Sequence, residues 1–431
     1  MVNRSTRHVG GADLEKERMD TNPLNEADPE VAELVAAERH RRNVSLDLIA
    51  SENLCPRAVR EAAGSILTDK YAEGYPGRRW YGGCGVVDEV EQLAIDRGKA
   101  LFGCEHINVQ PHSGSQANMA VYFASLEPGQ TILSMDLTHG GHLTHGKDAN
   151  FSGRMYHIVH YGVSPQDEQI DYDALAEQAR EVRPAMIVGG ASSYPRAVDV
   201  NRLANIAHDA GALLLVDMAH FAGLVAGGVH PDPVPVADFV TATTHKTLRG
   251  PRGGLVLCTA DWARRIDHTL FPGIQGGPLM HIIAGKAVTF ALAATDDFRR
   301  YQHQVVANCQ AMADELTSLG YRLVSGGTDT HLLLVDLRPM GLSGNQAQQQ
   351  IEAAGIVLNK NVIPFDDQPP SNPSGIRIGT PSITTRGAGE DDARQVARWI
   401  DQVLKAADPV AEAARVRGDV EAFCQSHPIP D

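Results

Sequence analysis

The residues with the clearest chemical potential lie in a polar run that follows an apolar stretch of the chain. The run Thr243–Thr247 contains His245 and Lys246, and it leads into the glycine-rich run Gly250–Gly254. Burial and neighbouring charge lower the pKa of a lysine in such a turn and expose its lone pair, which suits a Schiff base with a carbonyl cofactor. Because a loop lysine is more often a solvated surface charge, this assignment depends on what else the chain supplies.

A carboxylate follows a second apolar run, upstream of the lysine. The run Ala212–Val216 predicts a short buried parallel strand, and Asp217 comes directly after it. Ligands bind at that end of the strands in open α/β sheets, and an aspartate there can pair with a protonated pyridine nitrogen. Taken alone, the same aspartate also fits a helix cap or a turn.

A candidate phosphate cradle lies further upstream. The segment His112–Asn118 places hydroxyl side chains and Gly114 at the start of a predicted helix, where backbone N–H groups and the helix dipole bind an anion. An ordinary serine-capped helix has the same pattern. A lysine, a carboxylate at a strand end and a phosphate cradle are together what pyridoxal phosphate requires, so the sequence predicts this cofactor.

Further segments resemble serine hydroxymethyltransferases, and they occur in the order that this family has them. These segments are Leu48–Asn53, Lys70–Gly77, Tyr81–Cys84, His139–Gly146 and Ser374–Pro381. The resemblance extends from about Asp28 to Ala407. It implies an α/β fold of the aspartate aminotransferase type (fold type I), with a large domain on a mostly parallel seven-stranded sheet and a smaller α+β C-terminal domain.

The elements that must position these residues follow from the hydrophobic pattern. Helical patterns alternate with short apolar runs after about residue 65, which indicates βαβ units. Strands are predicted at Ala185–Val188, Gly254–Leu257 and Leu332–Leu337, and helices at Asp28–Arg42, Gly344–Ala354 and Asp391–Ala406. We expect a polar extension and arm at 1–64, a cofactor domain at 65–300 and a small domain at 301–431. Residues 1–23 are polar and are expected to be mobile or an accessory tail.

The resemblance implies that the chain transfers the hydroxymethyl group of L-serine reversibly to tetrahydrofolate, giving glycine and 5,10-methylenetetrahydrofolate. The implied catalytic residues are Lys246, Glu73, Tyr81 and His245, with Glu73 as the acid–base group near the substrate side chain. The implied cofactor-binding residues are Ser113, Gly114, Ser115, His142, Ser192, Asp217, His220, Lys246, Gly276 and Gly277. In the family, the two glycines reach the phosphate bound by a neighbouring subunit, which implies a homodimer with a shared active site, or a tetramer.

Substrate recognition requires a partner for the amino-acid carboxylate. Arg377 suits it because guanidinium donors match a carboxylate, although a surface-strand arginine fits the same pattern. The resemblance implies substrate contacts from Ser51, Tyr71, Glu73, Tyr81, Arg252 and Arg377. It implies contacts to tetrahydrofolate, the co-substrate, from Glu73, Trp80, Tyr81, Leu137, Gly141, Leu143 and Asn361.

Two residues depart from the family pattern and keep alternatives open. Trp80 stands where the family usually has tyrosine, and Ile274 stands where it usually has glycine. One alternative is a tetrahydrofolate-dependent enzyme for α-methylserine that yields D-alanine, since one methyl group alters specificity by only about 1–3 kcal/mol. Another is a folate-independent aldolase for threonine-type β-hydroxy amino acids. A scaffold that has lost its chemistry is disfavoured by intact Lys246, Asp217 and Glu73.

Composition excludes some classes of protein. The chain has 431 residues and a formal net charge of −15, which disfavours a nucleic-acid partner. No apolar stretch approaches a membrane span, and six scattered cysteines suggest no disulfide framework, so a cytoplasmic location is expected. The spacing of His139, His142 and His145 could suit a metal, but no Cys or carboxylate pattern completes such a site, and none is predicted.

Overall fold

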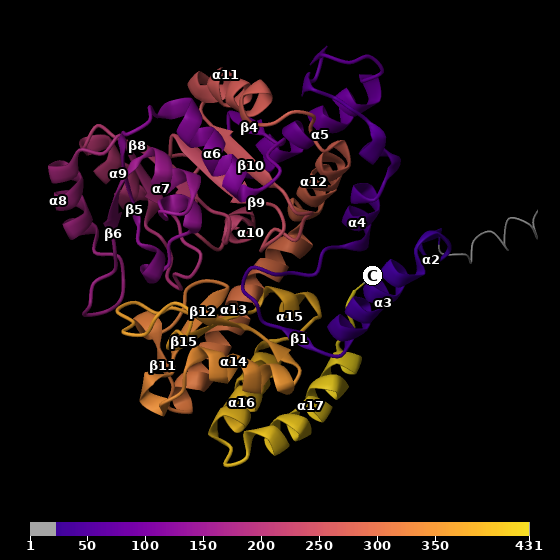
Figure 1. The fold of residues 1–431 in the computed structure, drawn as a ribbon, viewed down its shortest axis with the longest axis vertical. Helices are drawn as coiled ribbons and strands as arrows, with labels where there is room; N and C mark the ends of the chain where they lie inside the picture. Colours follow the sequence, from indigo (N-terminus) through magenta and orange to yellow (C-terminus); the bar gives the residue numbers. More distant parts are fainter. Residues whose placement is uncertain (1–22, 431) are drawn as a thin grey trace, which may run out of the picture.

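The computed structural model describes residues 23–430, so the predicted tail at 1–23 lies almost entirely outside the described part. Figure 1 shows two lobes: a large upper lobe in indigo to salmon and a small lower lobe in orange to yellow. Within the described residues, no helix combines the length and apolar character needed to cross a bilayer.

The upper lobe is built on a seven-stranded sheet with strand order β4-β10-β9-β8-β7-β5-β6. The strands are β4 (His106–Asn108), β10 (Gly254–Cys258), β9 (Phe239–Thr243), β8 (Leu213–Asp217), β7 (Met186–Gly189), β5 (Thr131–Met135) and β6 (His157–Tyr161). Neighbours from β9 to β6 pair in parallel. This arrangement confirms the predicted α/β fold with a mostly parallel seven-stranded sheet.

One strand runs against the others. The predicted strand at Gly254–Leu257 is present as β10, but it pairs antiparallel with both β4 and β9 instead of belonging to a βαβ unit. Residues 244–253 alone connect β9 to β10, and a parallel crossover needs about a dozen residues or more. The chain therefore turns back on itself, and Lys246 lies in that turn.

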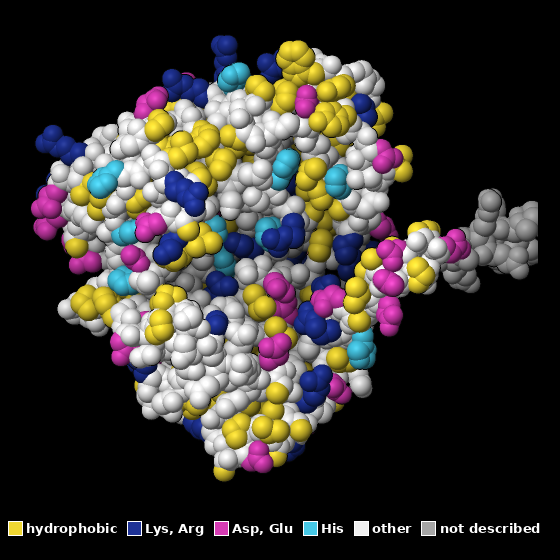
Figure 2. Space-filling model, in the orientation of Figure 1, with side chains coloured by type: hydrophobic (Ala, Val, Ile, Leu, Met, Phe, Trp, Pro, Cys, Tyr) yellow, Lys and Arg dark blue, Asp and Glu magenta, His cyan; other side chains and the backbone are white. Residues whose placement is uncertain are grey.

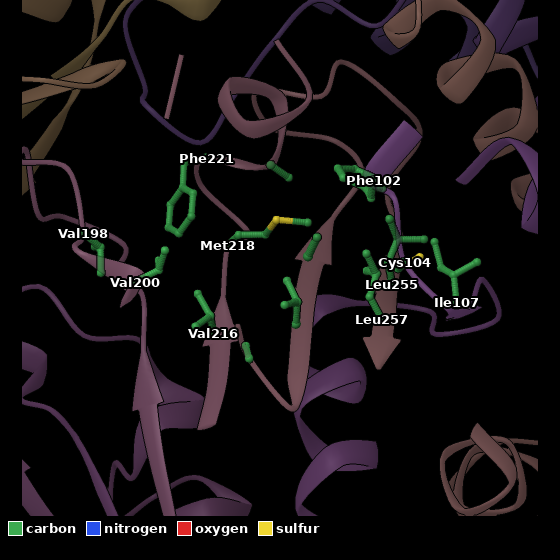
Figure 3. Close-up of a cluster of buried hydrophobic side chains, with 14 of the residues drawn as sticks. Phe102, Cys104, Ile107, Val198, Val200, Val216, Met218, Phe221, Leu255 and Leu257 are labelled. Carbon is green, nitrogen blue, oxygen red and sulfur yellow. The ribbon is translucent and has the colours of Figure 1, made fainter. Parts of the chain in front are cut away.

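Hydrophobic side chains cover both faces of this sheet. On β8, Leu214 and Val216 belong to the core on one face, whereas Leu215 belongs to the core on the other. Figure 3 shows Val216 and Met218 in the first of these cores. Since side chains alternate along a strand, Asp217 lies on the face opposite Val216, the face against which α6 (Gly114–Ser125) packs.

Helices surround the large sheet and connect its strands. They are α4 (Arg57–Ala63), α5 (Gly85–Phe102), α6, α7 (Phe151–Met155), α8 (Tyr172–Val182), α9 (Val200–Asp209), α10 (Ala222–Ala226), α11 (Ala260–His268) and α12 (Met280–Ala293). A short hairpin of β2 (Gly74–Tyr75) and β3 (Arg78–Arg79) precedes α5.

The lower lobe is a four-stranded antiparallel sheet with helices, as expected for the smaller α+β domain. Its strand order is β11 (Arg322–Leu323), β12 (Leu332–Asp336), β15 (Gly375–Gly379) and β14 (Asn359–Asn361). The helices are α14 (Gly344–Ala353), α15 (Pro381–Thr385), α16 (Glu390–Lys405) and α17 (Pro409–Ser426). The strand predicted at Leu332–Leu337 and both predicted helices are confirmed within one residue at each end.

Two segments tie the lobes together. The long helix α13 (Asp296–Ser318) contributes Phe298 and Val305 to the upper core, and Cys309 and Leu316 to the lower core. The N-terminal strand β1 (Leu46–Asp47) pairs with β13 (Ile356–Val357) of the lower lobe. The domain boundaries at 64 and 300 remain predictions.

The first long helix, α3 (Pro29–Asn43), confirms the helix predicted at Asp28–Arg42. Asp28 caps it by accepting a hydrogen bond from the backbone N–H of Val31 at 3.1 Å. Its apolar residues nevertheless remain exposed: Val31 at 43%, Leu34 at 69% and Val35 at 47%. The described chain therefore leaves this apolar face of α3 uncovered.

Candidate active site

A cavity of about 420 Å³ lies where the strands of the large sheet end, and we call it the lysine pocket. The predicted residues that line it are Ser51, Ser113, Gly114, Ser115, His142, Ser192, Asp217, His220, His245, Lys246, Arg252 and Arg377. Figure 2 shows Lys, Arg and His side chains gathered where the two lobes meet. Residues predicted from separate parts of the sequence thus share one cavity.

The turn that carries Lys246 is fixed by its backbone. The carbonyl of Thr244 accepts a hydrogen bond from Gly250 N at 2.6 Å, and Thr244 N donates to the carbonyl of Gly253 at 3.1 Å. The side chain of Asn53, from the N-terminal arm, donates to the carbonyl of Lys246 at 3.1 Å. The lysine is therefore presented from a closed turn rather than from a free loop.

Lys246 is partly buried beside several charged groups. Burial lowers the pKa of Lys246 to about 8, while Asp217 opposes this shift and Arg377 adds to it. A fraction of the amine is consequently neutral near neutral pH, which gives Nζ the lone pair that a nucleophilic lysine needs.

Asp217 is 8% exposed and lies in a network of hydrogen bonds. Its Oδ2 accepts from Asn118 Nδ2 at 2.9 Å and lies 3.1 Å from His145 Nε2, and its Oδ1 accepts from Ala219 N at 3.0 Å. Burial alone raises the pKa of Asp217, but the contact with His145 outweighs it and holds the pKa well below its usual value. Asp217 is therefore a carboxylate, as a partner for a protonated ring nitrogen must be.

Two histidines lie beside Asp217, and hydrogen bonds hold both rings in place. His145 Nδ1 accepts from the backbone N–H of His142 at 3.2 Å, so its proton is on Nε2, which donates to Asp217. His142 Nδ1 accepts from Thr144 N at 3.3 Å and lies 2.7 Å from Thr144 Oγ1. Burial lowers the pKa of His142 to about 4, so its ring is neutral and has an aromatic face for stacking.

The three histidines considered as metal ligands do not come together. His139 accepts a hydrogen bond from Val163 N at 3.1 Å and packs on Phe365, whereas His142, His145 and Asp217 have ligand atoms within 4.8 Å of one another. Hydrogen bonds already use Nδ1 of His142 and both nitrogens of His145. These contacts favour a hydrogen-bonded network over a metal site.

The predicted phosphate cradle is the first turn of α6. Ser113 caps the helix by accepting from Gln116 N at 3.2 Å, and Gly114 and Ser115 follow at the helix start. The neighbouring strand approaches so closely that a Cβ on Gly254 would lie 2.3 Å from the Ser113 carbonyl oxygen. His245 lines the same cavity, and its buried Nδ1 has no partner among the described residues. An anion at the helix N-terminus, Lys246 and ionised Asp217 together fit pyridoxal phosphate.

Arg377 enters the pocket from β15 of the lower lobe. Its Nη1 donates to the Ser192 carbonyl at 2.7 Å, and its Nε donates to Asn359 Oδ1 at 3.1 Å. Burial lowers the pKa of Arg377 to about 10, and the guanidinium still carries its charge at neutral pH. These contacts fix the plane of the guanidinium and suit it to a substrate carboxylate.

His220 is a buried residue that lines the lysine pocket and meets His331 of the lower lobe. Their rings stack with centroids 5.5 Å apart, and His220 Nδ1 lies 3.3 Å from His331 Nε2. Burial holds the pKa of His220 well below its usual value and lowers that of His331 to about 3, so both rings are neutral.

A second group of predicted residues lies apart from the lysine pocket, and we call it the hairpin cluster: Tyr71, Glu73, Tyr81, Gly276 and Gly277. The rings of Tyr71 and Tyr81 meet edge to face, with centroids 5.0 Å apart. A Cβ on Gly276 would lie 3.3 Å from Glu73 Oε1, and one on Gly277 would lie 3.3 Å from the Tyr71 ring. None of these five residues lines the lysine pocket.

The hairpin cluster is anchored by Arg79, whose side chain is 3% exposed. Its guanidinium contacts Asp88 at 2.8 Å and Glu91 at 2.6 Å on α5, and donates to the carbonyls of Ala72 and Gly74 at 2.9 Å each. Arg79 therefore holds both ends of the segment that carries Glu73.

The remaining predicted folate residues are dispersed. Leu137 and Leu143 are 36% and 51% exposed on short helical turns (Leu137–His139 and Leu143–His145), and Gly141 lies between those turns. Asn361 lies on β14, and Trp80 is 78% exposed beside a separate cavity of about 710 Å³. None of them lines the lysine pocket, so their role in binding folate remains a prediction.

Ile274, the second departure from the family pattern, causes no backbone strain. It does not have a positive φ, and its side chain packs against the core between the sheet and α6. An added Cβ is therefore accommodated at this position.

Sequence reasoning missed residues that act through long-range contacts. Asn118 donates to both Asp217 and Thr144, and accepts from Thr241 Oγ1 at 2.6 Å. The sequence suggests His145 only as a possible metal ligand, yet its Nε2 contacts Asp217. No local pattern identifies either residue, because their partners lie far away in the sequence.

The chain also matches the model of a known protein family. Residues 24–400 match the family model described as serine hydroxymethyltransferase. The matched region includes both the lysine pocket and the hairpin cluster.

Proposed function

Because the chain belongs to the serine hydroxymethyltransferase family, a pyridoxal-phosphate-dependent family of hydroxymethyl transferases, we propose that it converts L-serine and tetrahydrofolate to glycine and 5,10-methylenetetrahydrofolate. The observation that carries this proposal is the lysine pocket, in which Lys246, ionised Asp217 and the N-terminus of α6 face one cavity. The free state of all six cysteines supports a cytoplasmic location.

The residues that would hold the cofactor follow from the donor set. Ser113, Gly114 and Ser115 would hold the phosphate, Asp217 the ring nitrogen and His142 the ring face. When bound, pyridoxal phosphate supplies a sink for the electrons released when a bond at the amino-acid carbon breaks.

The protein's own groups bind and orient the amino acid. Arg377 binds its carboxylate, because Ser192 and Asn359 already fix the guanidinium plane. Lys246 takes up and returns a proton at Nζ, for which a pKa of about 8 is suited. Ser51 and Arg252 line the same cavity and contribute polar contacts to the substrate.

Glu73 is the proposed acid–base group for the substrate hydroxyl. Its carboxylate lies beside Tyr71 and raises the pKa of that phenol. The Tyr71 phenol therefore offers an O–H next to this carboxylate, and Tyr81 contacts the Tyr71 ring edge to face. The hairpin cluster thus supplies the acid–base group for the substrate hydroxyl, whereas the lysine pocket supplies binding and the Lys246 amine.

A second subunit would bring the two groups together. The hairpin cluster lies outside the lysine pocket of its own chain, which supports an active site shared between the subunits of a homodimer. Exposed apolar side chains mark a surface for that contact: Ile66 at 85%, Trp80 at 78% and Val86 at 70%, in addition to those on α3. Light scattering on the purified protein tests this assembly, and a monomer that retains full activity would contradict it.

The reaction is tested by the absorption spectrum of the purified holoenzyme with glycine or D-alanine, each with and without tetrahydrofolate. We expect glycine with tetrahydrofolate to give a strong long-wavelength band, because both ligands fill the site when the α-proton is removed. A strong band with D-alanine and a weak one with glycine would instead indicate the α-methylserine enzyme. Cleavage of β-hydroxy amino acids at an equal rate without folate would indicate an aldolase.

A further inference from the structure

Lys286 on α12 is an unusual buried charge that the proposed mechanism does not use. The residue is 1% exposed, and its Nζ donates to three backbone carbonyls: Val109 at 2.6 Å, Gly254 at 2.8 Å and Pro111 at 3.1 Å. An ammonium group has three N–H donors, and here each has an acceptor. Burial lowers the pKa of Lys286 to about 7, the charge of Glu91 opposes this shift, and the three carbonyl acceptors favour the protonated amine.

The three carbonyls belong to backbone segments that flank the phosphate cradle. Val109 and Pro111 lie between the end of β4 and the start of α6, and Gly254 is the first residue of β10. Gly254 N also donates to the Pro111 carbonyl at 2.9 Å, and a Cβ on Gly254 would contact the Ser113 carbonyl. The Lys286 ammonium therefore joins two backbone segments next to Ser113.

The charge of Lys286 also reaches the cradle. Burial and then the Lys286 charge lower the pKa of His112, the residue immediately before Ser113. The end of the Lys286 side chain is also closely packed against Gly253. A Cβ on Gly253 would lie 2.6 Å from Lys286 Cε and 3.0 Å from Nζ. The ammonium thus occupies a closed site with little spare room.

We propose that Lys286 is a positioning residue whose ammonium fills a three-carbonyl cation site and thereby holds the Ser113–Ser115 cradle in its phosphate-binding shape. This inference rests on the proposed phosphate site. Without the ammonium, the three carbonyl oxygens that converge on Nζ lose their shared donor. We then expect the backbone segments that carry them to move apart. Binding of the phosphate group is then weakened, whereas binding through Lys246 is not.

The test measures the affinity of the apoprotein for pyridoxal phosphate and for pyridoxal, which lacks the phosphate. In Lys286→Ala we expect the affinity for pyridoxal phosphate to fall about tenfold or more, with less than about a twofold change for pyridoxal. Methylammonium chloride, small enough to enter the vacated site, should restore most of the lost affinity. Tetramethylammonium chloride at equal concentration controls for ionic strength, and Lys99→Ala controls for removal of an exposed lysine from the same lobe.

The outcomes separate this inference from the proposed function. A wild-type protein that binds both ligands equally would overturn the phosphate site and this inference with it. A wild-type preference for pyridoxal phosphate that Lys286→Ala retains, or a loss that methylammonium does not reverse, would overturn the role of Lys286 alone. If Lys286→Ala does not fold, Gly253→Ala displaces the ammonium by steric contact, and an unchanged preference in that variant would likewise overturn the role.

Discussion

The lysine pocket and the hairpin cluster differ in how much of their structure the chain itself provides. In the pocket, Asp217, His142 and His145 are each fixed by hydrogen bonds from the same chain. The contact with His145 keeps Asp217 ionised, and burial keeps His142 neutral. In the hairpin cluster, Tyr71 and Tyr81 are 55% and 48% exposed, and Gly277 lies against the Tyr71 ring. One chain thus gives the lysine pocket its own hydrogen-bonded frame, whereas the hairpin cluster is more exposed and is the part that we propose acts in the site of a partner subunit.

The largest expected effect follows from removing the pocket's nucleophile. Lys246→Ala should lower turnover by about a thousandfold or more, because the variant lacks the lysine amine that the described residues place in the cavity for covalent catalysis. The visible absorption of the bound cofactor should disappear, while the circular dichroism spectrum stays that of a folded protein. Unchanged absorption in this variant would contradict the assignment of Lys246.

Glu73→Gln should produce a smaller loss with a different pattern. We expect folate-dependent turnover to fall about 10²- to 10³-fold, since the amide cannot transfer a proton, while cofactor and amino-acid binding remain. Spectrophotometric titration with glycine and a serine turnover assay check the two parts separately. Full serine turnover would exclude Glu73 as the acid–base group.

Mixing the two variants tests whether the halves belong to different chains. In a shared site, a heterodimer of Lys246→Ala and Glu73→Gln has one site with both residues intact, so exchange should restore about a quarter of wild-type activity. If each chain used its own residues, the mixture would stay inactive. Mixing Lys246→Ala with itself provides the control for refolding and dilution.

Removing the Arg79 side chain that anchors the hairpin cluster should affect the stability of the fold more than cofactor binding. Arg79→Met leaves Glu91 buried without its cation, so the free energy of unfolding should fall by about 3 kcal/mol. Turnover should fall as well, because the segment from Ala72 to Gly74 loses its anchor, but the affinity for pyridoxal phosphate should stay within a few-fold of wild type. Urea unfolding and cofactor titration measure these effects, with the exposed Arg417→Met as the matched control. A selective loss of cofactor affinity would mean that the two regions are not independent.

The same contrast separates what the sequence can predict from what it cannot. Each of three residues follows from a local pattern: Asp217 from a strand end, Lys246 from a turn and Ser113 from a helix start. The fold brings such positions to one edge of the sheet. Asn118 contacts Asp217 across 99 positions, and Lys286 contacts Val109 across 177, so no local pattern reveals them. The direction of β10 was missed because it depends on the length of the connection rather than on the apolar run.

The smallest effect is a pH dependence of the apoprotein's stability that comes from the pocket alone. Well below its folded-state pKa of about 8, Lys246 is protonated in both the folded and the unfolded chain. Between about pH 8 and its ordinary pKa of about 10.4, the unfolded chain binds more protons than the folded one, so the free energy of unfolding contributed by this group rises with pH. Because the side chain is only partly buried, we expect a rise of about 1 kcal/mol across that window relative to Lys246→Met. Glu73→Gln, a change in the other region, should keep the wild-type slope. Urea unfolding at several pH values measures it, and identical slopes for wild type and Lys246→Met would show that the fold leaves this amine's pKa unchanged.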